Sequence, residues 1–364
     1  MSRPSGASRK HPRPGAGKPR SITQTSVIAR LVRRYYEQNL TALSGTRRGL
    51  EEVFELSPDD LTSPISPSDV SVVICVYTLD RWTDILAAVS SVLTQRAGVR
   101  EVIVVVDHNP ALLQRLTAEY PALTVIANSH SQGLSGARDT GVAHASGRVV
   151  AFLDDDARAD PNWSVELSAA YGDPKVVGVG GWIEPYWSVP RPPWWPSEFD
   201  WVVGCSYRGL PSHRSAVRNV IGANMSFRRS VLERAGGFDA RMGRVGNGTT
   251  GGEETEVCIR VRERFPDTEI VFEPRARVFH RVSPQRAHWS YFVKRCWGEG
   301  QSKAQLAALA TRQAALATER DYVLRVLPGG FLRGTFSRFP PRGAAVAVGL
   351  LVTAVGYWSG RIRT

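Results

Sequence analysis

The stretch that decides the fold of this 364-residue chain is Arg148-Val149-Val150-Ala151-Phe152-Leu153-Asp154-Asp155-Asp156, an apolar run that passes directly into three carboxylates. A continuous apolar run of this length is typical of a strand that is buried on both faces of a sheet. Acidic triplets in surface loops are common and usually solvated. Three adjacent carboxylates repel one another, however, and a position directly after a buried strand favours their use in binding a metal ion or a nucleotide.

Three similar apolar runs precede this stretch, and helical patterns lie between the runs. Buried strands are expected over residues 71–77, 102–106 and 123–127, and helices over residues 82–95, 110–119 and 134–145. Alternation of strands and helices in this manner specifies a doubly wound α/β sheet. Because ligands bind such sheets at the carboxyl ends of the strands, the polar residues at these ends are the first candidates for a site.

Further candidates stand at the ends of the other predicted strands. Val76 and Tyr77 end the first strand and Asp107 ends the second. An aromatic ring for stacking and a carboxylate for hydrogen bonding indicate a nucleoside, although each residue taken singly also fits an ordinary turn. The small residues of Gly133–Gly141 open a helix, let a backbone approach closely and present Arg138 to an anionic ligand. Close packing of helix on strand explains the same glycines equally well.

The charge of the chain is distributed unevenly. With 46 Lys and Arg against 34 Asp and Glu, the net charge is +12. Residues 1–36 carry nine basic and no acidic side chains, and residues 322–364 carry six and none, which leaves residues 37–321 with a net charge of −3. A nucleic-acid-binding core is therefore disfavoured, since such cores carry basic residues on the folded face. Basic ends beside apolar stretches indicate an anionic membrane surface as a partner.

Several blocks of the sequence resemble, in the same order, the successive blocks of family 2 glycosyltransferases, the inverting enzymes with the GT-A fold. The blocks are Val72–Tyr77, Glu101–Asp107, Gly133–Gly141, Phe152–Ala157, Gly222–Arg229, Leu232–Asp239 and Gly251–Arg260. They span about residues 70–303. The resemblance implies a Rossmann-like doubly wound mixed sheet, a nucleoside-diphosphate sugar, most simply a UDP-sugar, as donor, and Mn²⁺ or Mg²⁺ as cofactor.

The resemblance also assigns residues to the donor and the cation. It places Asp156, Asp154 and His280 on the metal, although a core histidine satisfied by the backbone is the alternative for His280. The residues assigned to the nucleotide sugar are Val76, Tyr77, Asp107, Arg138, Asp154 and Asp155. A metal on these groups would stabilise the charge that develops on the departing nucleoside diphosphate.

On the acceptor side, the resemblance makes Glu254 the general base that deprotonates the attacking hydroxyl. The family usually has Asp at this position, so Glu253 is the substitute if the longer side chain of Glu254 is displaced. Asn224 and Trp182 are expected to contact the transferred or accepting sugar. Trp182 is the first of five tryptophans within residues 182–201, and exposed aromatic rings suit a sugar face or a bilayer interface. A cluster of rings stiffened by neighbouring prolines is the alternative.

The C-terminal residues suggest contact with lipid. Gly343–Trp358 is sixteen residues long and uncharged, and at 1.5 Å per residue it reaches about 24 Å, short of a ~30 Å hydrocarbon core. An interfacial or re-entrant anchor is therefore expected rather than a span, with a helix pair packed on the domain as the alternative. The domains predicted are a disordered basic tail (1–22), a helical segment and linker (23–68), the GT-A domain (69–303), an amphipathic helical segment (304–338) and an apolar anchor with a basic tail (339–364).

These features predict a metal-dependent inverting glycosyltransferase on the cytoplasmic face of a membrane. It would move a sugar to a hydroxyl of a polyprenyl-phosphate-linked sugar or a related cell-envelope glycan. Direct transfer to polyprenyl phosphate and nucleotidyl transfer remain alternatives. A non-catalytic membrane scaffold is disfavoured because the acidic residues at Asp154–Asp156 and Glu254 are intact.

Overall fold

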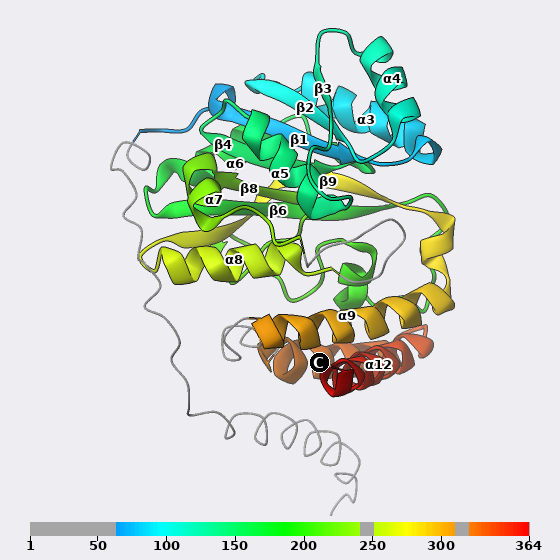
Figure 1. Ribbon diagram of the computed structural model, residues 1–364. Helices are drawn as coiled ribbons and strands as arrows, with labels where there is room; N and C mark the ends of the chain where they lie inside the picture. The colour runs from blue at the N-terminus through cyan, green and yellow to red at the C-terminus, as the bar shows by residue number, and fades with distance from the viewer. Residues whose placement is uncertain (1–62, 241–250, 310–319, 364) are drawn as a thin grey trace, which may run out of the picture. The chain divides into compact units, whose positions relative to one another are not determined.

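The computed structural model describes residues 63–240, 251–309 and 320–363, so the predicted basic tail (1–22) and nearly all of the segment 23–68 lie outside the described residues. The described chain forms a nine-stranded sheet in the order β3-β2-β1-β4-β8-β6-β9-β5, with β7 beside β9 (Figure 1). The strands are β1 (Val70–Val76), β2 (Glu101–Val106), β3 (Thr124–Ala127), β4 (Val149–Asp154), β5 (Ala157–Ala159), β6 (Val176–Trp187), β7 (Ser215–Ala216), β8 (Asn224–Arg228) and β9 (Glu269–Val282).

Helices cover both faces of this sheet. The α-helices are α3 (Trp82–Leu93), α4 (Pro110–Glu119), α5 (Leu134–His144), α6 (Trp163–Ala169), α7 (Arg229–Ala235), α8 (Glu253–Arg264), α9 (Trp289–Leu309), α11 (Leu327–Thr335) and α12 (Pro341–Arg363). Short turns of 3-10 helix include η2 (Leu79–Arg81), η4 (Ser197–Val203) and η5 (Pro284–Ala287), and η6 (Tyr322–Val326) is a π-helical turn.

The sheet is parallel in its first half and mixed in its second. β1 pairs in parallel with both β2 and β4, and β3 continues the parallel set beside β2. β8 then runs antiparallel between β4 and β6. Successive side chains of β1 enter opposite cores, Val72 on one face and Val73 on the other, which explains why the sequence of this strand is continuously apolar. The prediction of a doubly wound mixed sheet is confirmed.

The prediction that residues 123–127 form a strand buried like the others was wrong in its burial. β3 pairs only with β2, so it lies at the edge of the sheet. Its residues are exposed at Thr124 and Ala127 and half-buried at Val125 and Ile126. An apolar run alone does not distinguish an edge strand from a central one, because both bury at least part of their side chains.

The glycines of the predicted helix-opening stretch serve packing in this structure. A Cβ on Gly141 of α5 would stand 2.4 Å from a methyl group of Val73 in β1, and one on Gly136 would stand 2.3 Å from the carbonyl oxygen of Ser131. α5 therefore lies closer to the sheet than a larger residue would allow. The packing interpretation of Gly133–Gly141 accounts for these two positions.

The C-terminal helices form a layer against the side of the sheet that carries the larger core cluster (Figure 1). α9 runs through the predicted boundary at residues 303 and 304. α12 has 23 residues, about 34 Å at 1.5 Å per residue, and is thus longer than the uncharged run from which its reach was predicted. Within it, Pro341–Ile362 is long and apolar enough to cross a membrane. Of its most apolar stretch of 18 residues, however, 39% is buried inside the molecule. The alternative of helices packed on the domain describes this burial.

Candidate active site

The acidic triplet lies where β4 ends, and its carboxylates separate to two sides of the chain. Asp154 is the last residue of β4 and keeps 34% of its side chain exposed, while Asp155 and Asp156 are buried. Asp155 and Asp156 form the turn that joins β4 to β5. Asp154 and Asp156 accordingly come together, and Asp155 does not join them.

His280 reaches this pair through the register of two short strands. β5 begins one residue after Asp156, and its Ala157 pairs with His280 in the antiparallel strand β9. The Nε2 atom of His280 lies 3.0 Å from Oδ1 of Asp156, and the imidazole is 3% exposed. Ligand atoms of Asp154, Asp156 and His280 all lie within 4.8 Å of one another. Two carboxylates and one imidazole are donors that suit Mn²⁺, so the three residues predicted for the metal fit a divalent cation.

Two arginines that the sequence analysis did not single out neutralise the triplet. Arg81, at the end of η2, forms an ion pair with Asp155 and lies 3.3 Å from Oδ2 of Asp156. Arg286, in η5, lies 3.4 Å from the same oxygen. Arg81 stands four residues after Tyr77 and Arg286 six after His280, so each follows a predicted site residue closely in the sequence. Proximity in sequence to strand-end candidates was the signal that could have found them.

The buried carboxylates respond to these cations in opposite directions. Burial by itself raises the pKa of Asp156, but His280, Arg286 and Arg81 outweigh it and hold the pKa well below its usual range. Burial of Asp155, offset only in part by Arg81 and reinforced by its acidic neighbours, raises the pKa of that carboxyl to about 7. Oδ2 of Asp155 is also buried without a hydrogen-bond partner among the described residues. The site is thus built to hold negative charge at Asp156.

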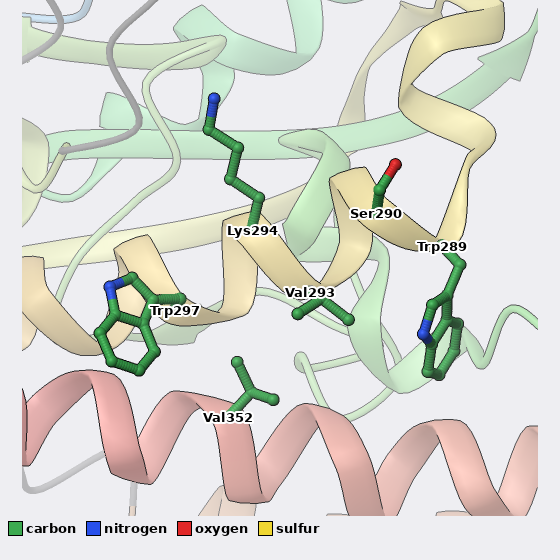
Figure 2. Close-up of a pocket in the computed structure, with 6 residues that line it drawn as sticks. All are labelled: Trp289, Ser290, Val293, Lys294, Trp297 and Val352. Atoms are coloured by element: carbon green, nitrogen blue, oxygen red, sulfur yellow. The ribbon is translucent and has the colours of Figure 1, made fainter.

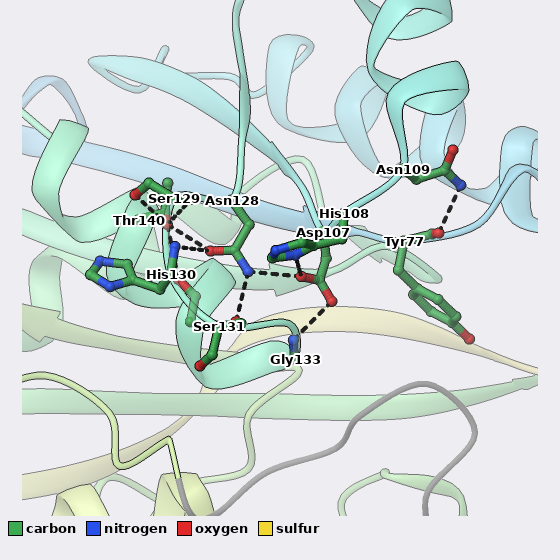
Figure 3. Close-up of polar contacts among 11 residues, drawn as sticks. Tyr77, Asp107, His108, Asn109, Asn128, Ser129, His130, Ser131, Gly133 and Thr140 are labelled. Carbon is green, nitrogen blue, oxygen red and sulfur yellow. Dashed lines mark hydrogen bonds and ion pairs between the residues drawn. The ribbon is translucent and has the colours of Figure 1, made fainter.

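Asp107, which follows β2, holds together the loop between β3 and α5 (Figure 3). Its Oδ1 accepts hydrogen bonds from Asn128 Nδ2 at 2.7 Å, and its Oδ2 accepts from the backbone N–H of Gly133 at 3.0 Å. Asn128 follows β3 and Gly133 caps α5, so one carboxylate ties together the ends of two elements. Asn128 was missed from the sequence although it follows a predicted strand in the same manner as Asp107.

Val76 and Tyr77, both predicted to contact the nucleotide sugar at the end of β1, differ in the burial of their side chains. The side chain of Val76 is buried in the core, and its carbonyl accepts a hydrogen bond from the backbone N–H of Asp107. Val76 has therefore no side-chain contact to offer a ligand. The ring of Tyr77 is half-buried and extends away from the Asp107 network, with the guanidinium of Arg81 5.2 Å from its centroid (Figure 3).

Arg138 joins the acidic triplet to the start of α8. Its guanidinium is 2% exposed and lies 2.9 Å from Oε1 of Glu253 and 3.9 Å from Oδ1 of Asp154. Arg138 forms a buried ion pair with Glu253, and its contact with an anionic ligand stays a prediction. Glu253 is buried by the same contact, whereas its neighbour Glu254 is half-buried in the first turn of the helix.

The geometry of this sheet edge agrees with comparisons to known proteins. The model of the glycosyl transferase family 2 matches residues 71–236. A glucosyl-dolichyl phosphate glucuronosyltransferase of Haloferax volcanii is 36% identical over 238 residues, which cover 64% of this chain and 76% of the relative. The chain belongs to glycosyltransferase family 2. It is therefore a glycosyltransferase, as predicted.

Two further likenesses are more distant. The succinoglycan biosynthesis protein ExoM of Rhizobium meliloti is 24% identical over 244 residues, covering 66% of this glycosyltransferase and 75% of the relative. Among solved structures, the mannosyltransferase PcManGT of Pyrobaculum calidifontis, in complex with GDP-Man and Mn²⁺, is 19% identical, with a TM-score of 0.50 over 92% of this chain and 96% of that one. The structural likeness supports the GT-A fold.

The prediction that Asn224 of this glycosyltransferase contacts a sugar is wrong. Asn224 is fully buried at the start of β8. Its Oδ1 accepts a hydrogen bond from Trp163 Nε1 at 2.9 Å, and its Nδ2 donates to the carbonyl oxygens of Trp182 and Ala276 at 3.1 and 2.9 Å. These contacts use its donors and fix three strands of the core, so the amide is not available to a ligand.

The tryptophan-rich segment mostly forms a ring cluster of its own. Trp194 and Trp195 lie 5.2 Å apart between centroids, and both contact Phe292 of α9. Trp195 is 1% exposed. Trp182 lies apart from this cluster in β6, half-buried, and its Nε1 donates to Oε2 of Glu184 at 2.7 Å. Trp194 and Trp195 therefore follow the alternative of an aromatic cluster, which also includes Phe292. Contact of Trp182 with a sugar stays a prediction.

Proposed function

We propose that this glycosyltransferase moves one sugar from a nucleoside-diphosphate sugar, most simply a UDP-sugar, to a hydroxyl of a sugar that is linked to polyprenyl phosphate, or of a related cell-envelope glycan. The observation that carries the proposal is the position of Arg138. One buried guanidinium contacts Glu253 at the start of α8 and lies beside Asp154 of the cation site. The helix turn that carries Glu254 is therefore held next to the group of residues that would hold the donor.

The residues divide the reaction between them. Asp154, Asp156 and His280 would hold a divalent cation, which supplies electrostatic stabilisation of the charge on a departing diphosphate. Glu254 would accept the proton of the acceptor hydroxyl as its oxygen attacks the anomeric carbon from the side opposite the diphosphate. Since Arg138 occupies Glu253, we assign the base to Glu254. Asp107 would orient the nucleoside through its fixed carboxylate, and Tyr77 would offer its ring for stacking.

The acceptor is proposed to be a hydroxyl because the site retains an acid at Glu254. A lipid monophosphate is already anionic near pH 7 and needs no base, whereas a sugar hydroxyl does. The name of the Haloferax volcanii relative, a glucosyl-dolichyl phosphate glucuronosyltransferase, describes an enzyme of this kind and supports a lipid-linked acceptor. We propose that the reaction takes place on the cytoplasmic face of a membrane, where nucleotide sugars are present.

The test is an acceptor-dependence assay. Full-length enzyme is incubated with a panel of nucleotide sugars and Mn²⁺ or Mg²⁺, and released nucleoside diphosphate is measured with polyprenyl phosphate, with polyprenyl-phosphate-linked sugar, or with neither. We expect diphosphate release to require the lipid-linked sugar. Equal release with polyprenyl phosphate would support direct transfer instead. In a parallel incubation with nucleoside triphosphates, release of pyrophosphate would identify a nucleotidyltransferase.

A further inference from the structure

Exposed apolar side chains gather on the C-terminal helical layer. Of the fifteen large hydrophobic side chains that are exposed in the described part of the chain, ten follow residue 288. They are Trp289, Leu324, Phe331, Leu332, Phe336, Phe339, Leu351, Val355, Trp358 and Ile362. Single exposed apolar residues need no explanation, but a concentration on one group of helices marks an interaction surface.

Two of these helices present continuous apolar faces. On α12, Leu351, Val355 and Trp358 are 64%, 47% and 46% exposed, and their spacing of four and three residues places them on one face of the helix. On α9, Trp289, Val293 and Trp297 follow one another at intervals of four. Between the helices lies a groove of about 590 Å³, lined by Trp289, Ser290, Val293, Lys294, Trp297 and Val352 (Figure 2).

α12 is fixed along α9 by close backbone contact. A Cβ on Gly356 of α12 would stand 2.4 Å from the carbonyl oxygen of Trp297, and one on Gly300 of α9 would stand 2.2 Å from the carbonyl oxygen of Thr353. The contact is therefore as close as helices can approach. α9 in turn buries Phe292 and Cys296 in the large core cluster of the catalytic domain. Because α12 packs on α9 and α9 packs on the catalytic domain, we expect all three to meet a bilayer together.

The charge of this layer complements anionic lipid. Residues 322–364 contain six arginines and no acidic residue. Arg325, Arg333 and Arg338 are exposed and close in sequence to the exposed rings of Phe331 and Phe336, and two of them, Arg325 and Arg333, also form ion pairs with Asp321 and Glu198. Apolar side chains bordered by arginines are typical of helices that lie in the headgroup region of a membrane.

We propose that the outer faces of α9, η6, α11 and α12 dock onto an anionic lipid bilayer with α12 lying in the plane of the surface, so that this helix does not span the membrane. The apolar groove between α9 and α12 accommodates lipid chains of the facing leaflet. This docking does not depend on the identity of the donor or acceptor. It can therefore be tested without either, and its failure is separable from failure of the proposed reaction.

The first experiment is vesicle flotation of the full-length enzyme. Vesicles of phosphatidylcholine with phosphatidylglycerol should carry the protein upward, and vesicles of phosphatidylcholine alone should carry far less. The double substitution Leu351→Ser with Val355→Ser should lower the partition coefficient roughly tenfold or more. Leu93→Ser, at a leucine of α3 that is 50% exposed, is the matched control and should leave binding unchanged. Equal losses in both variants, or none in either, would overturn the proposal.

The second experiment measures depth along α12. Single cysteines replace Ala344, Leu351 and Trp358, which share one helix face at intervals of seven residues, and each is labelled with a fluorophore that lipid-borne quenchers reach. The native thiols compete poorly for the label because burial raises the pKa values of all four, to about 12 for Cys75, Cys258 and Cys296 and well above the usual value for Cys205.

A helix lying in the surface gives one shallow depth at all three positions. A spanning helix gives a deep label at position 351 between two shallow ones, and that result would contradict the proposal. If lipid-borne quenchers reach none of the labels in vesicles and the enzyme is a dimer in solution, a second copy of the chain covers this face instead, and the proposal fails.

Discussion

Two acidic segments of the molecule, Asp154–Asp156 after β4 and Glu253-Glu254 at the start of α8, each bury a carboxylate against an arginine. Arg81 pairs with Asp155 and Arg138 with Glu253. The segments differ in how their other carboxylates lie relative to one another. At the turn after β4 the first and third carboxylates come together and meet His280, whereas neighbours on a helix diverge by about 100°. The strand end thus brings together two candidate cation ligands, and the helix start directs Glu253 and Glu254 to different sides of α8.

The largest effect expected from this comparison is at Asp156. Asp156→Asn removes a charged ligand from the set that includes Asp154 and His280, so both Mn²⁺ affinity and sugar transfer should fall by roughly a hundredfold or more. Mn²⁺ affinity is measured from the electron paramagnetic resonance signal of the free ion, and transfer from released nucleoside diphosphate. Asp173→Asn, at an exposed aspartate before β6, is the control for loss of a charge. Unchanged Mn²⁺ affinity in Asp156→Asn would remove the cation site from this strand end.

The next effect separates the two glutamates. Glu254→Gln should lower kcat by roughly a hundredfold to ten-thousandfold and leave the affinities for Mn²⁺ and for the nucleoside diphosphate unchanged, because a general base acts only on the acceptor. Steady-state kinetics and calorimetric binding of the nucleoside diphosphate supply the two readings. Glu256→Gln, which removes a partner of Arg260 in the same helix, is the matched control. Loss of kcat in Glu253→Gln at normal stability, with Glu254→Gln active, would reverse the assignment.

Much of this site could be predicted because strand ends follow from local sequence. Apolar runs located β1, β2 and β4, and the residues directly after them include Tyr77, Asp107 and the acidic triplet. The pairing of His280 with Ala157 depends on the register of β5 and β9, which no local pattern specifies, and only the family resemblance pointed to it.

The errors have physical causes of the same kind. Asn224 lies in a segment whose family role pointed to the acceptor, but its amide is consumed by Trp163 and two carbonyl groups from distant strands. The ion pair of Arg138 was not foreseen, because its buried partner Glu253 lies 115 residues further along the chain. Long-range pairing of polar groups is a tertiary property, and periodicity in the sequence carries no information about it.

The inward carboxylate of α8 should act on stability. The pair of Arg138 and Glu253 is almost fully buried, with 2% and 5% of the side chains exposed. Glu253→Gln leaves the guanidinium in the interior without its charged partner, which should lower the free energy of unfolding by about 4 kcal/mol. Urea denaturation measures this loss. A drop below about 1 kcal/mol would show that Asp154 or solvent replaces Glu253 and that the pair is not structural.

Arg191 and Asp200 form another inward pair, and this pair tests whether burial or pairing decides the charge of a carboxyl. Burial raises the pKa of Asp200 to about 6 despite Arg191, above the value of 3.8 for a free side chain. A carboxyl with a higher pKa in the folded state stabilises the protein below pH 3.8, and this contribution disappears as the pH rises to about 6.

Asp200→Asn resembles the protonated form at every pH. Relative to the wild type, its free energy of unfolding should therefore rise by up to about 3 kcal/mol between pH 4 and pH 6 and stay level above. Denaturant titrations of both proteins across this range give the difference, in which all other titrating groups cancel. A constant difference would mean that Arg191 holds Asp200 charged throughout, as Arg81, Arg286 and His280 do for Asp156, and that pairing rather than burial decides the state of the carboxylate.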